Sequence, residues 1–214
     1  MLVEKIDALY TAVVSPNVHN YDGSQNKEEF RDGIEYLNRR LQGIDSEEIW
    51  FLEIGAFKGL WALAFSILCE LNNKIPKYVT VTWISQDPNN RDIFSTRQYF
   101  DDHGLFFHLV DANSSLPETV KKVRSISAAY NFVFIDGDHS FNGVMQDIKN
   151  YAGLATDLLL FHDINTRDCG VRKAINKSRV PLNLEISYGN IMGIGIKNCR
   201  VMTPLPKKKG FPFF

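Results

Sequence analysis

Residues 49–55 read Ile-Trp-Phe-Leu-Glu-Ile-Gly, a continuous apolar run that holds one acid and ends at a glycine. A run of this kind predicts a strand buried on both faces, as in a parallel sheet. The next stretch, residues 59–73, has the apolar content and the ordinary length of a helix. A buried strand that turns at a glycine into a helix is the first unit of an α/β fold.

The same alternation of strand and helix continues toward the C-terminus. Strands are predicted at 78–85, 105–112, 131–138 and 157–164, and helices at 91–104, 116–127, 141–154 and 170–178. Two last strand-like runs, 183–189 and 191–198, meet at a tight Gly-Asn connection and predict an antiparallel hairpin. The sequence therefore predicts a Rossmann-like α/β fold. We expect a seven-stranded, mostly parallel sheet with an antiparallel C-terminal hairpin and helices on both faces.

Composition excludes several classes of protein. The chain has 214 residues, 44% of them apolar, with 24 basic and 25 acidic residues and a formal net charge of −1. Disordered chains combine low hydrophobicity with high net charge, and nucleic-acid binders carry a basic surplus, so neither class fits. The longest apolar stretch, 60–68, is about half the length of a membrane span. The three cysteines are widely separated, which fits a reducing compartment.

The arrangement of the chain predicts one main domain with additions at both ends. Two helical patterns, one ending at Pro16 and one over 26–41, predict an N-terminal helical extension or lid over 1–48. Residues 49–202 form the expected α/β domain, and 203–214 form a tail. The first residues lack the pattern of a secretory signal, so we expect a cytoplasmic protein without a membrane or nucleic-acid partner.

The first strand ends in a motif suited to a ligand. Glu53, Gly55, Ala56 and Gly59 stand where the strand passes into the helix, with the two glycines in the spacing GxxxG. Glycines allow a ligand close to the backbone, and the helix N-terminus offers N–H groups to an anion. This spacing differs from the GxGxxG of dinucleotide sites. A plain glycine turn between strand and helix remains the alternative.

Acids also follow the second and third strands. Asp87 is placed to accept hydrogen bonds from the hydroxyls of a ribose, and Asp111 to accept one from an adenine amino group. The alternative for Asp87 is a turn opened by Asp-Pro. Asp111 is also a candidate cap for the following helix, where Asn113 and Ser114 are its rivals.

The fourth strand delivers a cluster of polar residues to the same edge. Asp136, Asp138 and His139 follow the apolar run 132–135 within four residues. Placing this much charge at the rim of a buried sheet is costly unless a cation or a substrate compensates it. A solvated loop remains the alternative, although it explains one acid more readily than the whole cluster.

His162 and Asp163 follow the fifth strand. Strands four and five are expected to be neighbours, so Asp136 and Asp163 should face each other, which calls for a proton or a metal between them. Oxygen ligands without a thiolate favour Mg²⁺, Mn²⁺ or Ca²⁺ over zinc. His162 as a third ligand shifts the preference toward Mn²⁺ or Fe²⁺, and its alternative is a hydrogen-bonded histidine of the core.

Three motifs together, residues 51–59, 132–148 and 158–164, resemble the class I S-adenosylmethionine-dependent methyltransferases. The subgroup with IDGDHS followed by HD includes small-molecule O-methyltransferases, and the resemblance spans about residues 49–197. It implies S-adenosylmethionine as cofactor, with Glu53, Gly55 and Gly59 at its methionine half, together with Ala56 and Asp136. It further implies Asp87 at the ribose and Asp111 at the adenine. It also implies Mg²⁺ or Mn²⁺ on Asp136, His162 and Asp163, and His139 as general base.

The predicted function is methyl transfer from S-adenosylmethionine to a hydroxyl group of a small molecule, with help from a divalent metal. Homo-oligomerisation is left open. One alternative is an NAD-dependent oxidoreductase, which has a similar sheet. A second is a metal-dependent phosphohydrolase that uses Asp136 and Asp138. The third is a cofactor-binding scaffold without catalytic activity.

Overall fold

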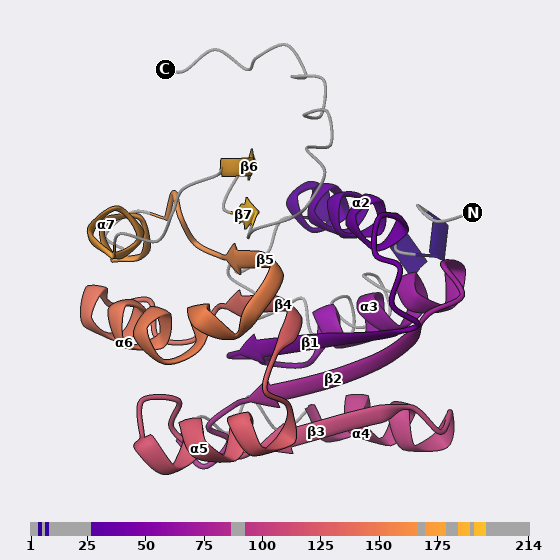
Figure 1. Cartoon of the computed structure of the whole chain (residues 1–214), viewed down its shortest axis with the longest axis horizontal. Helices are drawn as coiled ribbons and strands as arrows, with labels where there is room; N and C mark the ends of the chain where they lie inside the picture. Colours follow the sequence, from indigo (N-terminus) through magenta and orange to yellow (C-terminus); the bar gives the residue numbers. More distant parts are fainter. Residues whose placement is uncertain are drawn as a thin grey trace.

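A computed structural model of the chain describes residues 4, 5, 7, 8, 27–86, 93–166, 170–178, 184–188 and 191–195 (Figure 1). The strands are β1 (Glu48–Ile54), β2 (Ile75–Val81), β3 (Phe106–Val110), β4 (Tyr130–Ile135), β5 (Ala155–Phe161), β6 (Leu184–Tyr188) and β7 (Ile191–Gly195). The helices are α2 (Lys27–Gln42), α3 (Leu60–Leu71), α4 (Ile93–Asp102), α5 (Pro117–Ile126), α6 (Phe141–Tyr151), the 3₁₀ turn η3 (Ala152–Leu154) and α7 (Val171–Lys177).

Five parallel strands form the body of the sheet in the order β3-β2-β1-β4-β5. Phe51 of β1 is in register with Tyr78 of β2 on one side and with Phe132 of β4 on the other. The order reverses between β1 and β4, the place where open α/β sheets bind ligands. The prediction of a Rossmann-like α/β fold with a parallel five-stranded sheet is confirmed, and the sheet order continues to β7 and β6.

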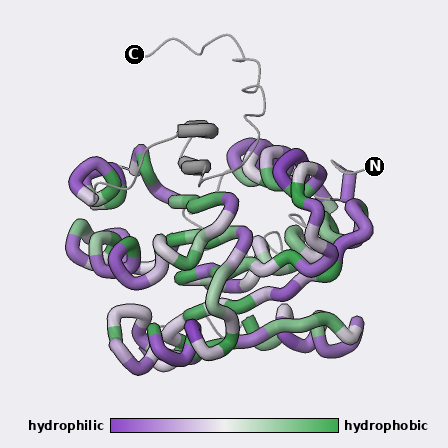
Figure 2. The backbone as a smooth tube through the Cα atoms, viewed as in Figure 1, coloured by the Kyte–Doolittle hydropathy of each residue, from purple (hydrophilic) through white to green (hydrophobic). Residues whose placement is uncertain are grey.

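Two hydrophobic layers enclose the sheet because successive strand residues point to opposite faces. One layer packs Phe51, Tyr78 and Phe132 against α2, α3 and α4, and the other packs Leu52 and Val133 against α5, α6 and α7. Figure 2 shows apolar residues along the central strands and polar residues on the outer helix faces. Full burial of each large side chain contributes about 1.5–3 kcal/mol.

The helix α2 belongs to the same core as the sheet. Phe30 of α2 is fully buried and meets Trp61 of α3 edge to face, with ring centroids 5.3 Å apart. The helix predicted over 26–41 is therefore confirmed by α2 and packs directly onto the α/β units. Of the helix predicted before Pro16, residues 4, 5, 7 and 8 are described and are helical. The Gly-Asn connection at 189–190 and the tail 203–214 lie outside the described residues.

The second strand differs from its prediction. It spans Ile75–Val81 rather than 78–85, and Trp83 after its end is 41% exposed. Directly after the strand, the hydroxyl of Thr82 accepts a hydrogen bond from the backbone N–H of Ala56 at 3.0 Å. None of the helices within the described residues combines the length and apolar character that crossing a bilayer requires.

Gly55 marks the point where the ends of β1 and β4 come into contact. Its φ of +88° lies in the left-handed region, and its N–H donates to the carbonyl oxygen of Val81 at 2.9 Å. The N–H of Asp136 donates to the carbonyl oxygen of Ile54 at 2.8 Å. A Cβ atom on residue 55 would lie 2.3 Å from the carbonyl oxygen of Asp136. Only glycine allows this approach.

We expect Gly55→Ala to lower the free energy of unfolding by about 2–4 kcal/mol, because the methyl group forces the two loops apart. Urea unfolding of the variant and the parent protein measures this loss. Gly153→Ala is the matched control, since a Cβ there meets no atom within 4 Å, and its effect should stay within about 0.5 kcal/mol. Equal losses in the two variants would contradict the argument.

Candidate active site

A cavity of about 510 Å³ opens at the carboxyl ends of the parallel strands. Its walls come from the turns after β1, β2, β3, β4 and β5, so it lies across the reversal of strand order. The volume is in the usual range for sites of small ligands. The large side chains of Phe57 and Trp61 line this cavity and leave it open.

Four of the residues expected to bind the cofactor line the cavity: Glu53, Gly55, Ala56 and Asp136. Gly59 has a different place, at the start of α3 with a φ of +82°. A Cβ on Gly59 would lie 2.7 Å from the side chain of Thr96, so this glycine allows α3 to pack closely against α4. Phe57, between the two glycines, also has a positive φ of 46°. The turn is thus tightly constrained.

The two remaining residues expected to bind the cofactor are Asp87 and Asp111. Asp87 lies outside the described residues. Asp111 is exposed and is not part of the cavity lining, and its Oδ1 accepts a hydrogen bond from the backbone N–H of Ile84 at 2.9 Å. The prediction that Asp111 meets the adenine stays a prediction.

The helix-cap alternative for the loop after β3 is wrong. The helix α5 begins after Leu116, which makes no side-chain capping bond. Instead, Asn113 Oδ1 accepts the N–H of Ser115 at 2.8 Å, while the hydroxyl of Ser114 donates to Asp147 Oδ1 at 2.7 Å. Asn113, Ser114 and Ser115 all line the cavity, so this loop forms one of its walls.

Asp147 is a buried acid that the sequence reading did not single out. It is 1% exposed, and burial raises its pKa to about 6, although the hydrogen bond from Ser114 works in the opposite direction. One turn later on α6, the hydroxyl of Tyr151 donates to the carbonyl oxygen of Ser114 at 2.6 Å. The helix α6 therefore braces the wall after β3. An acid on the apolar face of α6, beside Val144 and Ile148, was the available signal.

Glu53 is buried on the cavity floor beside Tyr78. It is 1% exposed, and the hydroxyl of Tyr78 donates to its Oε2 at 2.5 Å. Burial raises the pKa of Glu53 to about 8, with a smaller contribution of the same sign from Asp136, while Tyr78 and His162 lower it. The side chain is therefore mainly protonated at neutral pH, and the floor of the cavity carries less negative charge than the sequence suggests.

The pKa of Glu53 predicts how stability changes with pH. Between about 4.5, the ordinary value, and about 8, the folded chain holds one proton more than the unfolded chain. The stability that Glu53 contributes is therefore complete at low pH and declines by about 1.4 kcal/mol per pH unit across this window. We expect the difference in unfolding free energy between the parent and Glu53→Gln to show this slope in urea titrations from pH 5 to 8. A difference that does not change with pH would show that Glu53 is ionised in the folded protein.

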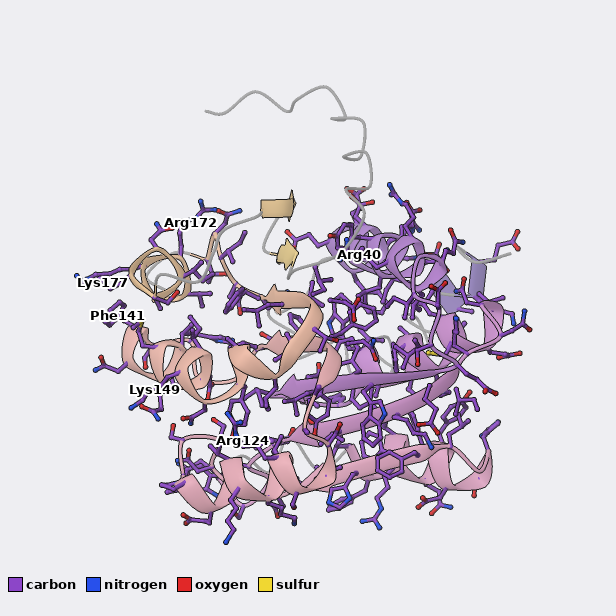
Figure 3. All side chains as sticks on the ribbon, in the orientation of Figure 1. Arg40, Arg124, Phe141, Lys149, Arg172 and Lys177 are labelled. Atoms are coloured by element: carbon purple, nitrogen blue, oxygen red, sulfur yellow. The ribbon has the colours of Figure 1, made fainter. Side chains whose placement is uncertain are left out.

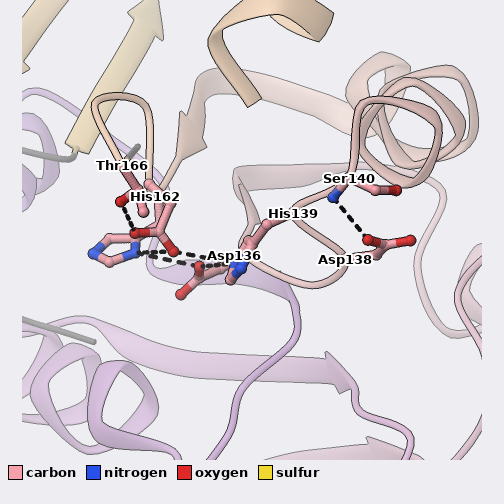
Figure 4. A network of polar contacts seen from close by, with 7 residues as sticks. Asp136, Asp138, His139, Ser140, His162 and Thr166 are labelled. Atoms are coloured by element: carbon pink, nitrogen blue, oxygen red, sulfur yellow. Dashed lines mark hydrogen bonds and ion pairs between the residues drawn. The ribbon is translucent and has the colours of Figure 1, made fainter. Parts of the chain in front are cut away.

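Two acids and two imidazoles meet at the ends of β4 and β5 (Figure 4). His139 Nε2 lies 3.3 Å from Asp136 Oδ1 and 3.2 Å from Asp163 Oδ2. His162 Nδ1 lies 3.4 Å and 3.3 Å from the same two oxygens. The expectation that Asp136 and Asp163 face each other is confirmed, because the parallel pairing of β4 with β5 sets them side by side.

The charges in this cluster compensate one another. Burial alone would raise the pKa of Asp136 and of Asp163, but the two imidazoles outweigh it, lowering that of Asp136 and bringing that of Asp163 to about 2. Burial would lower the pKa of His162, but the carboxylates raise it to about 10. The hydrogen bond with Asp136 raises the pKa of His139. The carboxylates are thus ionised, with His162 as their buried cation.

The two histidines differ in their access to the cavity. The side chain of His162 is 2% exposed, whereas that of His139 is 46% exposed. One ligand atom each from Asp136, His139 and Asp163 lie within 4.8 Å of one another. The expected metal ligands were Asp136, His162 and Asp163. In this group, His139 takes the place of His162. Asp163 has a positive φ of 53°, and its Oδ1 accepts a hydrogen bond from Thr166 at 2.5 Å, which fixes its orientation.

Asp138 points away from the cluster (Figure 4). Its Oδ1 accepts the N–H of Ser140 at 2.8 Å, and the Ser140 hydroxyl accepts the N–H of Gly143 as the N-terminal cap of α6. Asp138 therefore shapes the start of a helix. The phosphohydrolase alternative needs Asp136 and Asp138 to act on one substrate, and this arrangement speaks against it.

Comparison with known proteins shows the family. A family model described as a methyltransferase domain matches residues 52–164, more than half of the chain. The chain belongs to this methyltransferase family. As the motifs implied, it is a class I S-adenosylmethionine-dependent methyltransferase, and the oxidoreductase and phosphohydrolase alternatives are set aside. No curated protein matches the sequence.

Solved structures of methyltransferases share the fold. The ligand-free structure of CalS11, a TDP-rhamnose 3′-O-methyltransferase of calicheamicin biosynthesis, has a TM-score of 0.63 at 14% identity, covering 92% of this chain and 94% of CalS11. The S-adenosylhomocysteine-bound methyltransferase PaMTH1 of Podospora anserina has a TM-score of 0.59 at 17% identity, with 92% and 88% covered. MycE, with magnesium, S-adenosylhomocysteine and mycinamycin VI, has a TM-score of 0.56 at 12% identity, with 98% of this chain and 57% of MycE covered.

Proposed function

We propose that this methyltransferase transfers the methyl group of S-adenosylmethionine to a hydroxyl group of a small molecule. The observation that carries the proposal is the cluster of Asp136, His139 and Asp163 at the rim of the cavity, on the edge where the cofactor of this family binds. An O-methyltransferase must remove the proton of its acceptor, and the cluster offers an exposed imidazole held between two carboxylates. The acceptor named for CalS11, a sugar hydroxyl, is consistent with this chemistry.

The residues of the chain have two tasks in this reaction, because the sulfonium of the cofactor is itself a good leaving group. The cavity walls hold the acceptor oxygen in line with the methyl group, and positioning of this kind supplies up to about 7–11 kcal/mol in ideal cases. His139, in its neutral form with the Nε2–H directed at the carboxylates, takes the proton of the acceptor hydroxyl at Nδ1. The carboxylate of Asp136, 3.3 Å away, then stabilises the imidazolium.

We infer that Asp136 and Asp163 also suit a divalent cation. The carboxylate oxygens of Asp136 and Asp163 are donors of the kind that Mg²⁺ and Mn²⁺ accept, and they lie within 4.8 Å of each other. When bound, such an ion lowers the pKa of an acceptor hydroxyl. The magnesium in the MycE structure is consistent with this inference. In this structure, the protonated His162 lies against both carboxylates and compensates part of their charge.

Asp136→Asn separates chemistry from cofactor binding. We expect methyl transfer to fall by at least about 100-fold, because His139 loses the carboxylate that supports its proton. The affinity for S-adenosylhomocysteine in calorimetric titration should stay within about threefold, since the other cavity walls remain. Asn131→Ala, at the other end of β4, is the matched control for stability. Equal losses of affinity and turnover in Asp136→Asn would contradict the division of roles.

Two further variants distinguish a base from a metal ligand. If His139 is the base, His139→Ala should reduce turnover by about 10²–10⁴-fold and leave Mn²⁺ affinity within about threefold. Asp163→Asn should weaken Mn²⁺ binding by at least about tenfold, because a carboxylate ligand is lost. Calorimetry with Mn²⁺ and the methyl-transfer rate provide both readouts. A large loss of Mn²⁺ affinity in His139→Ala would make His139 a ligand and refute its role as base.

We also propose the remaining features of the family fold for this chain. The sheet is completed to seven strands by an antiparallel hairpin of β6 and β7, which is supported by the antiparallel register of Leu159 with Ile194. Residues 49–202 are the cofactor-binding domain, residues 1–48 an extension that covers it, and 203–214 a tail. The burial of Phe30 against Trp61 supports the close fit of the extension.

A further inference from the structure

A second cavity lies beside the acid cluster, on the outer side of α6 and α7. Its volume is about 610 Å³, and it is lined by Phe141, Arg172, Lys173, Asn176 and Lys177. Three of these five residues are cationic and none is acidic. Figure 3 shows Phe141, Arg172 and Lys177 together along one side of the molecule. We call this set of five residues the basic groove.

The basic groove is joined directly to both loops of the cluster. The N–H of Gly170 donates to the carbonyl oxygen of His139 at 2.8 Å, and a Cβ on Gly170 would lie 2.1 Å from the backbone nitrogen of Phe141. Arg172 Nε donates to the carbonyl oxygen of Ile164, the residue after Asp163, at 3.0 Å. A molecule in the groove therefore lies next to the loops that carry the cluster.

The cations of the groove are partly fixed in place. Arg172 is held by Ile164 and by Asn165 Oδ1, which engages two of its five N–H donors. Lys173 Nζ lies 5.3 Å from the ring centroid of Phe141, in the geometry of a cation–π contact. Less side-chain entropy is lost on binding an anion when the cations are already ordered.

Basic residues continue along this side of the molecule, while acids lie at its edge. The helices α5 and α6, which pack on the same face of the sheet, carry Lys121, Lys122, Arg124 and Lys149, and their acids are Glu118 and the buried Asp147. The exposed Asp138 precedes α6, and Asp136 and Asp163 lie in the adjoining cluster. An anion in the groove is therefore attracted chiefly by the three cations that line it.

We propose that the basic groove binds the phosphate groups of the acceptor, so that the substrate is a phosphorylated small molecule, such as a nucleoside diphosphate carrying a sugar. Lys173, Lys177 and Arg172 pair with the phosphate oxygens, and Phe141 offers an apolar surface to the rest of the molecule. The hydroxyl to be methylated then reaches His139 across the 139–141 loop. This inference rests on the proposed hydroxyl acceptor and names its chemical class.

Calorimetric titration with inorganic pyrophosphate and with uridine diphosphate, in the presence of saturating S-adenosylhomocysteine, tests the groove. We expect saturable binding at about 50 mM salt, where charge interactions are weakly screened. The double variant Lys173→Glu/Lys177→Glu should bind both probes at least about tenfold more weakly. The matched control, Lys121→Glu/Lys122→Glu, makes the same change of charge on α5 and should stay within about threefold.

The possible results show whether the groove binds an anion and which part of the probe it recognises. Tighter binding of uridine diphosphate than of pyrophosphate supports a nucleotide acceptor, and equal binding supports recognition of the phosphates alone. The absence of saturable binding, or equal losses in the two double variants, overturns the proposal. S-adenosylhomocysteine is titrated separately into the same protein samples. If it binds while the phosphate probes do not, only the groove proposal is rejected. If S-adenosylhomocysteine does not bind, the proposed function is rejected.

Discussion

The contact between Gly55 and the backbone of Asp136 is the constraint on which the site depends. The end of β1 lies so close to the loop after β4 that a Cβ on residue 55 would be 2.3 Å from the carbonyl oxygen of Asp136. The cavity floor and the cluster are therefore built from one junction. The hydrogen bond from Asp136 to the carbonyl of Ile54 extends the parallel pairing of β1 with β4 by one step beyond the strands. Because the order of strands reverses here, the opening that remains is the 510 Å³ cavity.

The acids on the floor of this cavity and those at its rim differ in their state of charge. Glu53 on the floor is mainly neutral, because the effect of its burial outweighs those of Tyr78 and His162 and raises its pKa to about 8. Asp136 and Asp163 at the rim are ionised, because two imidazoles approach them within 3.4 Å. Carboxyl groups thus serve as a neutral hydrogen-bonding group on the floor and as charged groups at the rim, where we propose that the acceptor binds.

The helix α6 connects the parts of the site that lie far apart in the sequence. Its first turn follows His139, its middle holds Ser114 of the opposite wall through Asp147, and Phe141 at its start lines the basic groove. The cavity wall after β3, the cluster and the basic groove are therefore all attached to one rigid element. An acceptor held in the groove would be positioned relative to the cluster by a helix rather than by a mobile loop.

The sequence by itself determined the class of fold and the edge at which chemistry occurs, because apolar runs ending in Gly55, Asp136 and Asp163 place their polar residues at the same ends of parallel strands. Only the tertiary structure decided which groups meet there. It set His139 rather than His162 in the exposed position and paired Asp147 with Ser114. It also directed Asp138 to the N–H of the cap residue Ser140, and Asp111 to the N–H of Ile84. The physical reason is that the position of each strand in the chain follows from its local apolar pattern, whereas the order of the strands and the direction of a loop side chain depend on partners that are distant in sequence.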